Sequence, residues 1–155
     1  RIKPFVPEIV VLDGDKMRAA FSADLGHSEE DRWRQIKRIQ GMAKILADQG
    51  IIVIIAVVYS HPDIHKWNRR HLPDYFEVHL NASLKTAMIR DKKGLYSLAK
   101  KGEISNVVGV AIPWHPPATP DLVISADDGA RPEVLQQRLI DSLPKVLRIR
   151  LPAEQ

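Results

Sequence analysis

The sequence of 155 residues contains no cysteine. Disulfides, thiolate metal sites and cysteine nucleophiles are therefore excluded together, and the chain fits a reducing cytoplasm, which is the compartment we expect. Long apolar runs are absent as well, because the longest, Ile51–Tyr59, is far shorter than the roughly 20 residues of a membrane helix. No basic segment followed by an apolar one resembles a signal peptide. We therefore expect no membrane partner.

Aromatic residues are scarce, at 6%, and the excess of basic over acidic residues is small, 23 against 19, or +4. The basic residues are interleaved with acidic ones, as in Arg32–Arg34 directly after Glu29–Asp31. A stacking platform for nucleic acid is therefore not expected, whereas a pocket for a small polyanion agrees with the charge. Apolar residues at 45% and charged residues at 27% are ordinary globular usage, so we expect residues 1–155 to form a single domain.

Alternating strand and helix patterns predict an α/β fold with a parallel sheet. Residues 51–58 are apolar at every position, which is typical of a strand buried on both faces at the centre of such a sheet. Ser28 precedes three acids and a helical apolar pattern that ends near Gly50, so it is expected to cap a helix. The other predicted strands are 9–12, 75–80 and 122–124, and the other predicted helices are 67–71, 84–90, 95–101 and 132–143.

Polar residues that follow the predicted strands are the candidate site, because ligands of parallel sheets bind at the carboxyl ends of the strands. Asp13 and Asp15 flank a glycine after the first strand, and such carboxylates can bind a divalent cation or act as a base. Arg18 follows them and can hold a phosphate or sulfate group through its forked donors. Asp-Gly is also a common turn sequence, so an ordinary turn remains an alternative.

Several spaced segments resemble adenylylsulfate kinases. Residues 12–18, LDGDKMR, and 24–32, DLGHSEEDR, are similar to the family patterns LDGDNxR and DLGFSxEDR. Residues 90–96, RDKKGLY, and 99–104, AKKGEI, are similar to RDPKGLY and ARAGEI, and the resemblance extends through the proline-rich loop to about Ser125. Motifs in the same order over most of the chain are far more specific than any one of them.

The resemblance implies a P-loop nucleoside-kinase-like, three-layer fold that transfers the γ-phosphoryl group of ATP to the ribose 3′-hydroxyl of adenosine 5′-phosphosulfate. It implies ATP and Mg²⁺ as cofactors, a homodimer, and possible fusion to or association with a sulfurylase. By position, the resemblance implies that Asp15 and Asp13 are catalytic carboxylates and that Asp15 also binds the metal ion. Arg90 matches a residue that lies near the base of ATP. The matching substrate-binding positions are Arg18, Arg32, Gln35, Ser60, Lys93 and Val107.

The chain also departs from the family pattern. It contains no G-x-x-x-x-G-K-[ST], the loop that cradles the phosphates of ATP. Too few residues precede Leu12 for that unit and residue 1 is not Met, so we expect the first strand, loop and helix to lie outside the sequence. A non-catalytic nucleotide-binding domain is the alternative if the loop is truly absent.

Four substitutions fall where the family contacts its substrate: Lys16, His27, Gln35 and Val107. His27 and Val107 each replace a phenylalanine of the family pattern. In the family, the phenylalanine at the position of Val107 stacks on the substrate base. Loss of a base stack costs about 1–3 kcal/mol. A different nucleotide-linked hydroxyl as acceptor therefore remains an alternative.

The sequence also contains residues of two other kinds of site. His61 and His65 are spaced as zinc ligands on a helix can be, but no acid or third histidine follows at ligand spacing, so a surface or helix-start role is expected for them. Ser60 lacks the G-x-S-x-G surroundings of a nucleophilic serine and is expected to be a polar strand-end residue.

Overall fold

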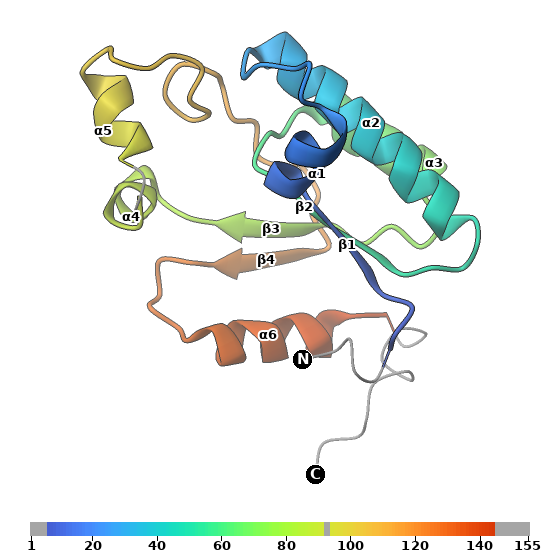
Figure 1. Cartoon of the computed structure of the whole chain (residues 1–155). Helices are drawn as coiled ribbons and strands as arrows, with labels where there is room; N and C mark the ends of the chain where they lie inside the picture. The colour runs from blue at the N-terminus through green and yellow to red at the C-terminus, as the bar shows by residue number, and fades with distance from the viewer. Residues whose placement is uncertain (1–5, 92–93, 145–155) are drawn as a thin grey trace.

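The computed structural model of the chain describes residues 6–91 and 94–144. Strands and helices alternate from the first strand onward (Figure 1). The strands are β1 (Val10–Asp13), β2 (Val53–Ala56), β3 (Val78–Asn81) and β4 (Leu122–Ser125). The helices are α1 (Gly14–Phe21), α2 (Glu29–Ala47), α3 (Pro62–His71), α4 (Leu84–Ile89), α5 (Leu95–Lys100) and α6 (Pro132–Ser142).

All strand pairing in the described residues is parallel, which confirms the predicted α/β class. β1 pairs with β2, with Val10 opposite Val53, and β3 pairs with β4, with Val78 opposite Leu122. The crossover helices α2 and α3 lie side by side near β1 and β2, and α6 runs beside β4 on the other side of the molecule (Figure 1). The carboxyl ends of β3 and β4 lead toward the end of the molecule that carries α4.

One expectation about the sheet is wrong for the described residues. β2 was predicted to be a central strand buried on both faces, but the described strands form two separate two-stranded sheets, and β2 pairs with β1 alone. Ile54 is 43% exposed and Val58, beyond the end of the strand, is 65% exposed. Burial alternates along β2, so one face of the strand packs on α2 and the other is exposed, and no described strand pairs along its second edge.

Side-chain caps explain where the main helices begin. The Ser28 hydroxyl accepts the backbone N–H of Asp31 and opens α2, as predicted. His61 caps α3 by accepting the N–H of Asp63, which confirms the expected helix-start role for this residue. Helix α1 was not predicted, because its first residue is Gly14 and its cap, Asp13, belongs to an Asp-Gly turn sequence.

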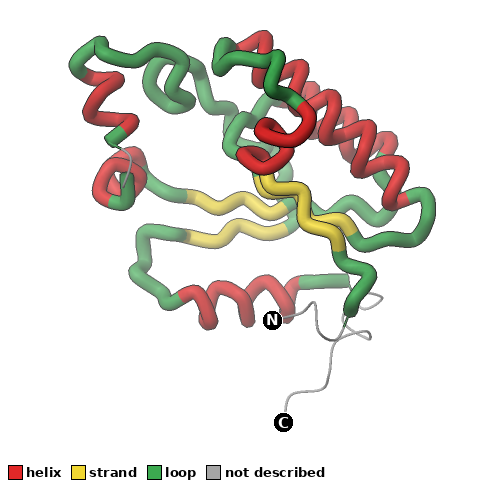
Figure 2. Tube along the Cα trace, in the orientation of Figure 1, coloured by secondary structure: helices red, strands yellow, loops and turns green. Residues whose placement is uncertain are grey.

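The core lies between β1, β2 and the apolar faces of α2 and α3. Its buried members include Leu12, Met17, Ile36, Ile39 and Ile64. Residues 101–121 carry no helix or named strand and form the long loop between α5 and β4 (Figure 2), whose Val108 and Ile112 reach the same core. Within the described ranges, no helix is long and apolar enough to cross a membrane.

Candidate anion-binding site

The turn that follows β1 is fixed by its own side chains and by α2. The Asp13 carboxylate accepts the backbone N–H groups of Asp15 at 3.1 Å and Lys16 at 3.0 Å, so this carboxylate caps α1. The Gln35 amide, 5% exposed, donates to the Gly14 carbonyl at 2.7 Å from beneath the turn. Asp15 is exposed, and its carboxylate has no hydrogen-bond partner in the described part of the chain. Of the two predicted carboxylates, Asp15 is therefore the one free to meet a ligand.

Two arginines converge beside this turn and bind backbone carbonyls. Arg18 donates from Nη1 to the carbonyls of Leu25 at 3.3 Å and Gly26 at 2.5 Å. Arg32 donates from Nε to the His27 carbonyl at 3.1 Å and from Nη2 to the Asn106 carbonyl at 3.0 Å. Neither guanidinium forms an ion pair with a carboxylate among the residues that the structure describes. Their charges are therefore positioned without being neutralised.

The pKa values of the titratable groups at this site are shifted by its excess of positive charge. Burial is the first cause that lowers the pKa of the Arg32 guanidinium, and repulsion from Arg18 is the second. The pKa of His27 is lowered by burial and then by Arg18 and Arg32. Asp15 opposes both effects without cancelling them. Such a site favours an oxyanion, because forked guanidinium donors match the geometry of phosphate and sulfate.

Tyr59 closes the site from the end of β2. Its hydroxyl donates to Glu29 Oε1 at 3.0 Å, and the ring is buried. Burial and the hydrogen bond to Glu29 raise the pKa of the Tyr59 phenol to about 12, while Arg32 acts in the opposite direction. Tyr59 is one of the polar residues that follow the predicted strands, but no role was predicted for its hydroxyl or for Glu29. The position of Tyr59 directly after an apolar strand was the available signal.

The loop at residues 106–112 contacts Arg32 through the carbonyl of Asn106, whose φ of 63° lies in the left-handed region. Val107 follows and is half-buried, and its carbonyl accepts the N–H groups of Val110, Ala111 and Ile112 at 2.9–3.1 Å. Val107 therefore lies next to the residue that Arg32 binds, and its role in substrate binding stays a prediction.

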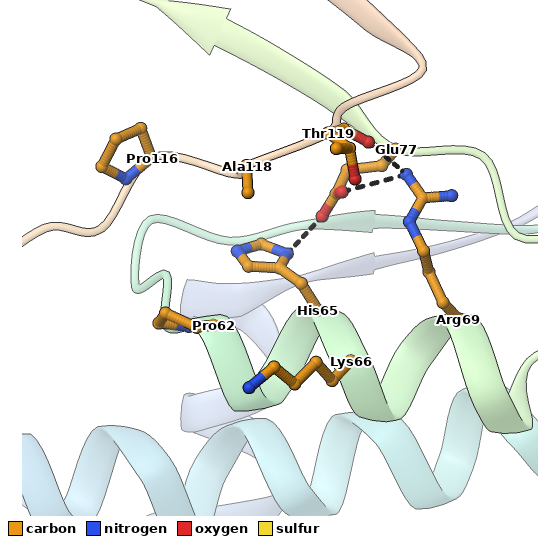
Figure 3. A pocket seen from close by; sticks show the side chains of 8 residues that line it. All are labelled: Pro62, His65, Lys66, Arg69, Glu77, Pro116, Ala118 and Thr119. Atoms are coloured by element: carbon orange, nitrogen blue, oxygen red, sulfur yellow. Dashed lines mark hydrogen bonds and ion pairs between the residues drawn. The ribbon is translucent and has the colours of Figure 1, made fainter.

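Ser60 lies deeper, in a second polar cluster beneath α3. Its hydroxyl donates to the His115 carbonyl, and His65 Nε2 lies 2.8 Å from Ser60 Oγ. His65 and Arg69 project from α3 toward Glu77, which is 6% exposed (Figure 3). His65, Arg69 and Glu77 line a hollow of about 270 Å³ beside the proline-rich loop. Ser60 is thus part of the framework that joins β2, α3 and β3.

The two remaining predicted residues lie elsewhere in the chain. Arg90 follows α4 and donates from Nη2 to the Ala126 carbonyl at 2.8 Å, so it lies past the carboxyl end of β4. Lys93 lies outside the described residues. The structure therefore gathers Asp15, Arg18 and Arg32 at one place and puts Arg90 beside the other pair of strands.

Comparison with known proteins places these features in a family. The parallel strands and crossover helices are arranged as in the APS kinase CysC of Mycobacterium tuberculosis, which was solved in complex with AMPPNP and APS, and the chain therefore has the α/β fold of the P-loop kinase class. The two superpose with a TM-score of 0.79 at 31% identity over 91% of this chain and 85% of that one. The family model described as adenylylsulphate kinase matches residues 6–125. The chain belongs to the adenylylsulfate kinase family.

Curated relatives agree with this assignment. The chain is 38% identical to the adenylyl-sulfate kinase of Acaryochloris marina over 135 residues, which are 86% of this chain and 65% of that protein. It is 38% identical to the corresponding protein of Vibrio parahaemolyticus over 128 residues, 81% of this chain and 62% of that protein. The chain therefore spans less than two thirds of the length of these two relatives.

Proposed function

We propose that the chain provides the acceptor site of an ATP-dependent kinase that phosphorylates the ribose 3′-hydroxyl of adenosine 5′-phosphosulfate. The observation that carries the proposal is the pair of guanidiniums, Arg18 and Arg32, which are positioned by backbone carbonyls and lack a carboxylate partner in the described residues. A phosphosulfate group carries two negative charges and supplies the missing partners. The names of the relatives support the same substrate.

Asp15 supplies the chemistry of the acceptor hydroxyl in this proposal. Its carboxylate is exposed at the first turn of α1 and lies close enough to Arg32 to oppose the arginine's pKa shift. A substrate held through its anion by Arg18 and Arg32 would present its ribose toward this carboxylate, which can accept the proton of the 3′-hydroxyl. Phosphoryl transfer depends mainly on such alignment and on neutralisation of charge.

Asp15 would be the residue to hold Mg²⁺, because its carboxylate is exposed and has no hydrogen-bond partner in the described residues, whereas Asp13 caps α1. The described residues contain no group of three or more His, Asp or Glu side chains that could hold a metal ion. Mg²⁺ in kinases usually takes one or two carboxylates and completes its shell with phosphate oxygens and water. We therefore assign Asp15 to the metal, which when bound would neutralise the charge of the transferred phosphoryl group.

The cofactor and assembly are parts of the same proposal. ATP would bind with its base near Arg90, and the family resemblance favours a homodimer in the cytoplasm, alone or with a sulfurylase. Because residues 1–155 contain no G-x-x-x-x-G-K-[ST], ligand binding tests this chain more directly than turnover does.

Calorimetric titration tests the proposal, with adenylylsulfate, AMP and adenosine as ligands. Adenylylsulfate should bind in the micromolar range and adenosine far more weakly, because most of the binding free energy comes from the arginine pair. Adenosine binding as tightly as adenylylsulfate would contradict the assignment. Tighter binding of another nucleotide than of adenylylsulfate would favour the alternative acceptor suggested by His27 and Val107.

A further inference from the structure

Arg32 of α2 binds two backbone carbonyls that lie far apart in the sequence. Its Nε donates to the His27 carbonyl at 3.1 Å, and its Nη2 donates to the Asn106 carbonyl at 3.0 Å. Among the residues that the structure describes, none accepts a hydrogen bond from Nη1 of this arginine. Because a guanidinium is planar and rigid, the two carbonyls fix its plane and leave the N–H groups of Nη1 available to a ligand.

The Asn106 carbonyl reaches Arg32 from an uncommon backbone conformation. The φ angle of Asn106 is 63°, in the left-handed region, and Asp74 at 49° is the only other described residue besides glycine with a positive φ. Glycine and asparagine tolerate this region, whereas it is costly for alanine and above all for β-branched residues. The Asn106 side chain donates to Ser105 Oγ at 3.2 Å, at an exposed position. Asn106 therefore contacts Arg32 through its backbone.

The residues that follow Asn106 are anchored in the hydrophobic core. Val108 and Ile112 are buried members of the core cluster and form a backbone bridge with each other. The Val107 carbonyl accepts three backbone N–H groups, and the N–H of Gly109 donates to the Ile112 carbonyl at 2.8 Å. Because this turn is held in place, the direction of the Asn106 carbonyl depends on the backbone angles of Asn106 itself.

We propose that Asn106 is a positioning residue of the acceptor site, whose left-handed backbone aims a carbonyl at Arg32 and thereby holds Nη1 of the arginine in the orientation that receives the substrate anion. The inference rests on the proposed function, because it deepens the same site. Asn106 acts through Arg32 and contributes no side chain to the ligand. A guanidinium that is oriented before binding loses less conformational freedom when the anion arrives, so the contact raises affinity.

Substitutions that change the backbone preference at residue 106 test the proposal. Asn106→Gly keeps the left-handed conformation without steric cost and should bind adenylylsulfate within about twofold of the unaltered chain. Asn106→Val disfavours that conformation, turns the carbonyl away from Arg32 and should weaken binding by about tenfold, because a charge-assisted contact is lost. Asn106→Ala is strained less strongly and should weaken binding by a smaller factor, and it takes the place of Asn106→Val if valine prevents folding.

Calorimetric titration measures these affinities, and urea denaturation shows that each variant is folded. Asp74 is the matched control, because it has a left-handed backbone in the turn between α3 and β3. Asp74→Gly and Asp74→Val both remove the carboxylate, so the comparison between them reports the effect of valine at a left-handed position. Asn106→Val and Asp74→Val should each be less stable than the corresponding glycine variant. Only the two variants at residue 106 should differ in their affinity for adenylylsulfate.

A second measurement follows Arg32 in the ligand-free chain. Hydrogen bonds to two separate carbonyls hinder rotation about its Nε–Cζ bond, so Nη1 and Nη2 of Arg32 should give separate signals in NMR spectra of the guanidinium groups. The signals are assigned by their loss in Arg32→Ala. Rotation should become faster in Asn106→Val and stay slow in Asn106→Gly and in both variants at residue 74.

Equal affinity of folded Asn106→Val and Asn106→Gly for adenylylsulfate would overturn the role of Asn106 and leave the proposed function intact. An equal loss in Asp74→Val would overturn it too, because general destabilisation would then be the cause. A loss in Asn106→Gly as large as in Asn106→Val would do the same, because it would assign the effect to the side chain.

Failure of the unaltered chain to bind adenylylsulfate would overturn the proposed function. The rotation of the Arg32 guanidinium in the ligand-free chain would then still decide whether Asn106 positions Arg32. Faster rotation in Asn106→Val alone would support this contact, and unchanged rotation would overturn it.

Discussion

The amide of Gln35 donates a 2.7 Å hydrogen bond to the carbonyl of Gly14, and this contact ties α2 to the turn that carries Asp15. The donor is almost fully buried, so loss of the bond leaves the Gly14 carbonyl without a partner in a place that water reaches poorly. This one side chain therefore helps to hold the turn against α2, the helix that also carries Arg32.

Gln35→Ala should lower the free energy of unfolding by about 1–3 kcal/mol, because a buried backbone acceptor loses its donor. Urea denaturation measures the change. Gln49→Ala is the matched control, since its amide also bonds to a backbone carbonyl, that of Ile45, but at an exposed position. Equal losses in the two variants would show that burial of Gln35 has no special effect.

Gly14→Ala and Gly41→Ala should differ in sign. A Cβ at Gly14 would lie 3.3 Å from the Ala56 carbonyl oxygen and 3.4 Å from Val57 Cγ1, so the turn or the end of β2 must move. A Cβ at Gly41, inside α2, meets nothing within 4 Å and should raise stability by about 0.5–1 kcal/mol. Thermal unfolding of both variants checks this, and a gain at Gly14 comparable to that at Gly41 would contradict the close packing of the turn.

Glu77→Gln should destabilise the chain by at least about 1–3 kcal/mol, since the buried carboxylate accepts hydrogen bonds from Tyr75 and Arg69 and pairs with His65. Glu30→Gln serves as the control, because its ion pair with Arg34 is exposed and should be worth less than about 0.5 kcal/mol. Chemical denaturation measures the free energy of unfolding of both variants. If Glu77→Gln lost no more stability than Glu30→Gln, the buried cluster would not contribute to stability as described.

Alkaline titration should show two tyrosine phenols that ionise at a higher pH than an ordinary tyrosine does. Tyr59 and Tyr75 have pKa values raised to about 12, both chiefly through burial. A phenol whose pKa is raised in the folded chain contributes stability that is complete below its unfolded pKa of about 10 and is lost as the pH rises through about 12. Ultraviolet absorption of the phenolates measures these ionisations.

Tyr59→Phe and Tyr75→Phe should each remove one late ionisation from that titration. Each variant should also lose less stability than the unaltered chain between about pH 10 and about pH 12. Ionisation of both phenols near the ordinary value of about 10 would contradict their burial.

Much of the fold could be predicted from local sequence signals. Ser28 with its three following acids marked the start of α2, and Pro132 marked the start of α6. Helix α1 escaped because its cap and first residue, Asp13 and Gly14, form a dipeptide that is equally at home in a simple turn. The strand order and the one-sided exposure of β2 depend on contacts far apart in the chain, which no local pattern contains.

The site divides in the same way. Arg18 and Arg32 were predicted by residue type and motif, and the structure brings them together. Their carbonyl partners at Leu25, Gly26 and Asn106 could not be predicted, because a backbone acceptor leaves no mark in the sequence. The pairing of Tyr59 with Glu29 likewise joins residues 30 positions apart.

The central claim is that Arg18 and Arg32 bind the anionic group of the substrate. Titration of adenylylsulfate into the Arg32→Gln variant tests this claim most directly. The loss of a charge-assisted contact should weaken binding by about 10- to 100-fold, while Arg34→Gln, which alters an exposed arginine two residues along the same helix, should bind as the unaltered chain does. An unfolding curve for each variant confirms that it is folded. Unchanged affinity in folded Arg32→Gln, or an equal loss in both variants, would contradict the central claim.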